Sequence, residues 1–103
     1  MRVAEAMRRG AKMGKQLRGT LLHDNNSCAM GAIVLGANTT DIGGKWPWLK
    51  TAAVIEIIVY LNDRCGWSRE AIADWLDTID PTIVREERKE EVAVVQEEEL
   101  VCV

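Results

Sequence analysis

Apolar residues recur along most of this chain at the three- and four-residue spacing of a helix face, which predicts a helical protein. The first such stretch spans residues 2–18, with arginines opposite the apolar side. Its apolar positions are Val3, Met7 or Ala6, Gly10 or Ala11, and Leu17. Gly10 and Gly14 weaken the helix and are expected to kink it or end it near Met13.

A second helix is expected over residues 28–36, after a loop over residues 19–26. The segment CAMGAIVLGA has no charged residue, and a helix that is apolar all round is a buried one. Its small residues would let neighbouring helices approach closely. Ser27 is the expected N-cap, and Gly36 or Asn38 the expected stop.

The turn-rich segment NTTDIGGKWPWLK precedes a long apolar stretch, residues 47–63. Pro47 suits the first turn of a helix, and the stretch does not alternate apolar and polar residues, so a third helix is predicted. Many side chains in residues 52–61 are β-branched, so a buried strand stays open as the alternative there.

Two further helices follow. Ser68 is the expected N-cap of the fourth, whose buried stripe would be Ile72, Trp75, Leu76 and Ile79. Pro81 would begin a fifth that reaches about residue 91. The predicted fold is all-α, a compact bundle of four to five helices with a short acidic C-terminal tail. We expect a helical domain over residues 1–80 and a charged helix and tail over residues 81–103.

The composition, 48% apolar and 28% charged, is that of an ordinary globular domain. Glu56 interrupts the longest apolar run, around residues 52–61, and the N-terminus has no long apolar core, so we expect a cytoplasmic protein without a membrane span or signal peptide. Three widely spaced cysteines (Cys28, Cys65 and Cys102) and one histidine fit a reducing compartment and neither a disulfide framework nor a zinc site. No metal and no cofactor is expected.

The net charge of −3 conceals a gradient. Residues 1–23 carry a net charge of +5 and residues 80–103 a net charge of −5. The gradient fits complementarity within or between chains, or a basic face for a partner, but solvated helix faces are the simpler interpretation. Asp74, Asp77 and Asp80 are expected to form one such solvated acidic face.

Cys28 is the most enzyme-like feature, because a thiol at a helix N-terminus is activated by the helix dipole. His23 lies five residues earlier and could act as its base. A small buried residue at the start of an apolar helix is the commoner meaning of such a cysteine, so catalysis is not favoured.

The tryptophans allow two interpretations. Trp67 and Trp75 are most simply core anchors. Trp46 and Trp48, between lysines in KWPWLK, could form an exposed loop that docks a partner, although core packing is favoured there too.

The stretch LNDRCGWSREAIADWL, residues 61–76, resembles the start of a helix-turn-helix. The turn expected after it lacks the usual glycine, and the recognition helix would carry four glutamates, which repel phosphates. Nucleic acid is therefore a weaker alternative partner. The candidate contacts are Arg8, Arg9, Lys12, Arg85 and Arg88.

Three motifs resemble a family of small uncharacterised proteins from bacterial and phage genomes. They are Met7-Arg8-Arg9-Gly10-Ala11 through Gln16, Cys28-Ala29-Met30-Gly31-Ala32, and the LND…W-S-R-E-x-I-A-D-W stretch from Leu61 to Trp75. Some similar proteins carry a cysteine-rich insert where this chain has TTDIGGKWPWLK. The resemblance implies a helical fold and a prokaryotic or viral origin, with no assigned activity.

Together these features predict a non-enzymatic accessory or interaction protein of a bacterium or phage. Its high apolar content for so short a chain favours a protein partner or self-association. The alternative is a small DNA-binding regulator, and a remote third is a thiol enzyme that uses Cys28.

Overall fold

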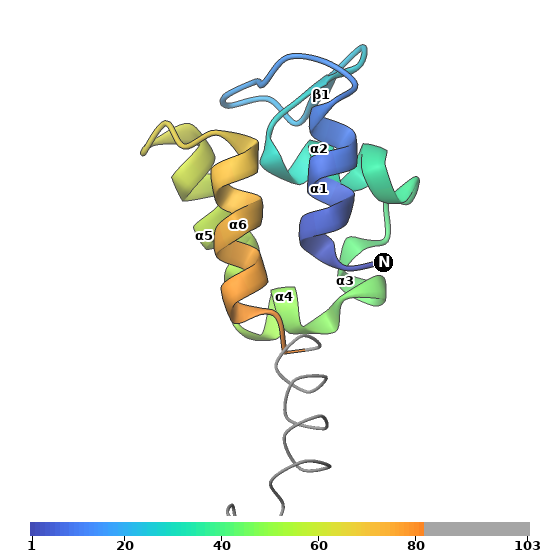
Figure 1. The fold of residues 1–103 in the computed structure, drawn as a ribbon, viewed down its shortest axis with the longest axis vertical. Coiled ribbons are helices and arrows are strands. Elements are labelled where there is room, and N and C mark those ends of the chain that lie inside the picture. Colours follow the sequence, from blue (N-terminus) through green and yellow to red (C-terminus); the bar gives the residue numbers. More distant parts are fainter. Residues whose placement is uncertain (82–103) are drawn as a thin grey trace, which may run out of the picture.

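The structure, a computed structural model, describes residues 1–81 and is mostly helical (Figure 1). Six helical segments and one short antiparallel hairpin follow one another in this part of the chain. They are α1 Val3–Ala11, β1 Leu22–His23, β2 Asn26–Ser27, α2 Ala29–Ala37, α3 Ile42–Lys45, α4 Pro47–Thr51, α5 Val54–Asp63 and α6 Arg69–Ile79. The expected fifth helix and acidic tail, residues 82–103, lie outside the described residues.

The core forms where α1 packs between α2 and α6, with α5 closing the far side of α6 (Figure 1). Of the apolar positions expected for the first helix, those within α1 are buried, whereas Leu17 lies beyond it and is half-buried. The helix expected to be buried all round, α2, is buried over residues 29–33 and half-buried over residues 34–37. Glycines permit the close approach of these two helices: a Cβ at Gly10 would collide with the carbonyl of Ala32, and one at Gly36 with that of Ala6. The largest fully buried apolar side chains are Val3, Met7, Ile33, Leu49, Ile58, Ile72 and Leu76.

The first helix ends close to the stop expected near Met13 and does not continue to residue 18, and the segment after it is not a simple loop. α1 ends at Ala11, and the chain from residue 12 to residue 28 crosses the end of the helices (Figure 1). Within it, β1 and β2 pair, and Gln16 bridges to Ser27. Because Ser27 is held in β2, Cys28 and not Ser27 is the N-cap of α2. Asn38, in the left-handed conformation, ends α2 as expected.

The predicted long helix over residues 47–63 is helical, but it is two helices. Ala53 adopts a left-handed conformation, with φ 56°, and separates α4 from α5. Leu49 and Val54 are five residues apart, a spacing that would put them on different sides of one continuous helix. The turn at Ala53 corrects this phase, so Leu49, Val54 and Ile58 all reach the core.

Ala53→Gly is expected to stabilise the protein by about 0.5–1 kcal/mol, because glycine adopts positive φ without steric cost. The alanine side chain is exposed, so little packing is lost. Urea unfolding of the two proteins measures the difference. Ala52→Gly, at an exposed neighbour with negative φ, is the matched control and should destabilise or change nothing. A less stable Ala53→Gly protein would contradict the expectation.

α6 begins as predicted, since the Ser68 hydroxyl oxygen accepts a hydrogen bond from the Ala71 N–H at 3.1 Å. Two expected core positions are wrong. Trp67 is 39% exposed because it stands in the turn that Gly66 makes before the helix, and Ile79 is exposed at the last turn. Trp75 does pack against the core.

Candidate functional site

Asn62, at the end of α5, joins three separate segments through its side-chain amide. Its Oδ1 accepts hydrogen bonds from the Gln16 side chain at 2.8 Å and from the Ala29 N–H at 3.0 Å. Its Nδ2 donates to the Leu17 carbonyl at 2.9 Å and to the carboxylate of Asp63 at 2.8 Å. The side chain is 1% exposed, so these partners take the place of water.

Arg69, the first residue of α6, reaches the same crossing segment from the other side. Its guanidinium donates to the Gly14 carbonyl at 2.8 Å and to the Ser27 hydroxyl at 3.1 Å. Burial lowers the pKa of this guanidinium, and its Nε has no hydrogen-bond partner among residues 1–81. Asn62 and Arg69 therefore fix residues 14–28 against the helices.

Asp63 also holds the segment over residues 14–28, at the surface of the protein. Its carboxylate accepts a hydrogen bond from the Gly19 N–H at 3.0 Å. This bond is the main cause, and the hydrogen bond from Asn62 the second, of a pKa of Asp63 below its ordinary value. The ionised form is the one that holds the loop, so this contribution to stability is present at neutral pH and is lost as the pH falls below about 4.

The fixed loop and α5 border an open cavity of about 370 Å³ beside the N-terminus of α2. Its walls are mostly apolar, and the amide of Asn62 is already bonded to other groups. The lining residues are Gly19, Thr20, Leu21, Cys28, Met30, Ile55, Val59, Asn62 and Asp63.

A second hollow, of about 470 Å³, runs along the outer side of α5 and is called here the α5 groove. It is lined by Glu56, Val59, Tyr60, Asp63 and Arg64. Two of these, Val59 and Asp63, also line the cavity, so the hollows adjoin. Tyr60 is 52% exposed, and Val59 and the neighbouring Ile57 are each 41% exposed. The α5 groove and Ile57 together are called the α5 face below.

The structure does not bring the candidate thiol and base together. Cys28 lines the cavity and is 8% exposed, and its Sγ accepts a hydrogen bond from the Gly31 N–H at 3.4 Å. His23 is exposed in the hairpin, with Nε2 3.8 Å from the Asp24 carboxylate. No hydrogen bond joins His23 to Cys28 in the described part of the chain.

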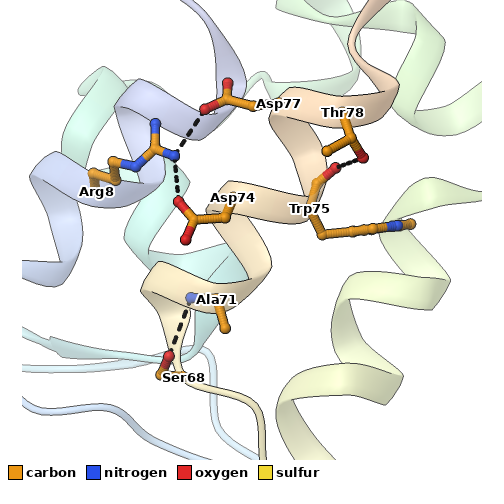
Figure 2. Close-up of polar contacts among 7 residues, drawn as sticks. All are labelled: Arg8, Ser68, Ala71, Asp74, Trp75, Asp77 and Thr78. Carbon is orange, nitrogen blue, oxygen red and sulfur yellow. Dashed lines mark hydrogen bonds and ion pairs between the residues drawn. The ribbon is translucent and has the colours of Figure 1, made fainter.

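Arg8, a candidate contact for nucleic acid, is instead bound within the chain. Figure 2 shows its guanidinium between Asp74 and Asp77 of α6, at 2.7 Å from each carboxylate. These hydrogen bonds raise the pKa of Arg8. The expected solvated acidic face is therefore partly paired, and Asp80 is buried.

The other candidate contacts for nucleic acid do not form one site. Arg9 pairs with Glu5 on its own helix at 3.4 Å, and Lys12 is exposed at the end of α1. Arg85 and Arg88 lie outside the described residues. The expected recognition helix also lies outside the described residues, and only the helix before it, α6, is described.

The two tryptophans considered for partner docking lie inward. Trp46 is 7% exposed and donates from its indole to the Met1 carbonyl at 3.2 Å, and Trp48 packs against the core. The sequence analysis missed the α5 face, since it treated the whole apolar stretch as buried. A usable signal was present: Glu56, Tyr60 and Arg64 are four residues apart and so share one side of a helix.

Residues 1–81 show neither a metal-binding cluster nor a membrane-spanning helix. No group of three metal-binding side chains gathers there, and none of the helices described is long and apolar enough to cross a membrane. In comparisons with protein-family models, curated proteins and solved structures, nothing matches this chain.

Proposed function

We propose that this chain is a non-enzymatic interaction protein that binds another protein chain through the α5 face. The observation that carries the proposal is the exposure of Tyr60, with exposed Ile57 to one side of it and exposed Val59 to the other, next to an apolar cavity. Contiguous exposed apolar side chains rimmed by charges are typical of protein-binding surfaces.

The physical setting of the α5 face supports this proposal. Tyrosine is favoured at interfaces because its ring supplies contact area and its hydroxyl stays hydrated. The loop over residues 14–28 is held rigidly beside α5 by Asn62 and Arg69, so the surface is ordered before a partner arrives. Preformed surfaces lose less conformational entropy on binding.

A bacterial or phage origin of the chain is part of the same proposal. The resemblance of its motifs to bacterial and phage proteins supports an accessory role in such a host. A DNA-binding role is less well supported, because Arg8 is held by Asp74 and Asp77.

Photo-crosslinking from the α5 face tests the proposed function. A benzophenone amino acid in place of Tyr60 is expected to yield discrete protein adducts in the living host, because an interface places a partner within reach of this side chain. Adducts are separated by electrophoresis and identified by mass spectrometry. The same substitution at Met13, which is equally exposed but lies beyond the end of α1, is the control. Absence of any protein adduct specific to position 60 would contradict the proposal.

A further inference from the structure

We infer that the partner of the α5 face is a second copy of this chain, bound with the two α5 helices antiparallel about a twofold axis. This inference rests on the proposed function, because it identifies the occupant of the same face. It depends on the order of charges and apolar side chains along α5.

The charges of the α5 groove are placed symmetrically about Tyr60. Glu56 lies four residues before it and Arg64 four residues after it, and all three line the groove. An antiparallel pair of helices centred on Tyr60 would set each Glu56 opposite Arg64 of the second copy. A parallel pair would oppose Glu56 to Glu56 and Arg64 to Arg64, so the charges favour the antiparallel arrangement.

The remaining acid of the groove does not upset this pairing. Asp63 is bonded to the Gly19 N–H and to the amide of Asn62 in its own chain. Those bonds lower its pKa, which shows that its charge is already stabilised locally. Glu56 and Arg64 form no ion pair within residues 1–81 and remain free to bind across an interface.

The apolar side chains supply the contact between the charged ends. Ile57, Val59 and Tyr60 are each 41–52% exposed and lie between Glu56 and Arg64. A twofold axis at Tyr60 brings the same patch of both copies together, so Tyr60 would meet its own counterpart, with Ile57 and Val59 flanking that contact. Burial of the apolar surface drives association, and the two ion pairs fix the direction.

Charge reversal tests both the partner and the direction. Glu56→Arg and Arg64→Glu, measured separately by sedimentation velocity, are each expected to weaken self-association about tenfold or more, because each creates two like-charge contacts per dimer. An equimolar mixture of the two variants is expected to recover association as mixed dimers, since every charged contact is then between opposite charges. The double variant Glu56→Arg/Arg64→Glu should likewise associate as the unchanged chain does.

Controls separate a lost interface from a lost fold. Glu56 and Arg64 are exposed, so both variants should keep the circular dichroism spectrum of the unchanged chain, and also its urea midpoint at protein concentrations low enough for all three proteins to be monomeric. Lys50→Glu reverses an exposed charge on α4, outside the α5 groove, and should leave association unchanged.

The inference is overturned if the unchanged chain is monomeric up to roughly 1 mM, where even weak specific dimers form. It is also overturned if the single reversals have no effect, or if their mixture does not recover association. A monomeric chain that nevertheless crosslinks from position 60 to a different protein would remove the second copy as partner and leave the proposed function standing. If the chain is monomeric and no protein adduct forms from position 60, both the inference and the proposed function are overturned.

Discussion

Gly36→Val is expected to unfold the protein or to cost about 3 kcal/mol or more in the free energy of unfolding. A side chain at Gly36 would collide with the backbone carbonyl of Ala6, and Gly10 makes the reciprocal approach to Ala32. Backbone atoms inside two packed helices cannot move aside as a flexible side chain can. Insertion of the valine therefore requires α1 and α2 to separate, and much of the core lies between them.

Urea unfolding followed by circular dichroism measures this effect against a total stability of about 5–10 kcal/mol for a domain of this size. Gly43→Ala is the matched control, because a Cβ there would meet only the flexible side chain of Lys50. The control is expected to shift the urea midpoint little. A Gly36→Val protein as stable as the control would contradict the close packing of α1 on α2.

Asn62→Ala is expected to destabilise the protein by about 3 kcal/mol, the second largest effect of a single substitution predicted for this chain. The change leaves the buried Ala29 N–H and the Leu17 carbonyl without their partners and also removes the bond to Gln16. Each buried polar group left unpaired costs about 1–3 kcal/mol. Urea unfolding gives the total, and hydrogen exchange at the Ala29 amide reports the local loss.

Two variants make this result specific. Asn25→Ala removes an exposed asparagine whose side chain has no hydrogen-bond partner within residues 1–81, and it should change the stability by less than about 0.5 kcal/mol. Asn62→Asp keeps the acceptor for the Ala29 N–H but loses the donor to Leu17. The Ala29 amide should therefore exchange more slowly in Asn62→Asp than in Asn62→Ala. Equal stability of Asn62→Ala and Asn25→Ala would refute the role of Asn62.

Local signals predicted the parts of the fold that local interactions determine. The apolar stretch of α2 and the Ser68 cap of α6 could be read from the sequence, because burial and capping depend on neighbouring residues. The break at Ala53 could not, since alanine is a strong helix former and its left-handed conformation follows from packing Leu49 and Val54 on one side.

The candidate site was less accessible to sequence reasoning for a related reason. The hydrogen-bond partners of Asn62 lie between 33 and 46 positions away in the sequence, and no local sequence pattern predicts partners at that distance. The exposed side of α5 depends on the turn at Ala53, and without that turn the whole apolar stretch was expected to be buried. Trp46 packs in the core, which is the interpretation that the sequence favoured, and the more exposed aromatic side chain is that of Tyr60.

The loop held by Asn62 and Arg69 also bears on how the chain folds. Arg69 binds Gly14 across 55 positions of sequence, so the loop cannot take its final form until α6 has been made and docked. Helical proteins fold fast when their contacts are local, and contacts of long sequence separation slow them. This helical domain is therefore expected to fold more slowly than a helical bundle of the same size whose contacts are all local.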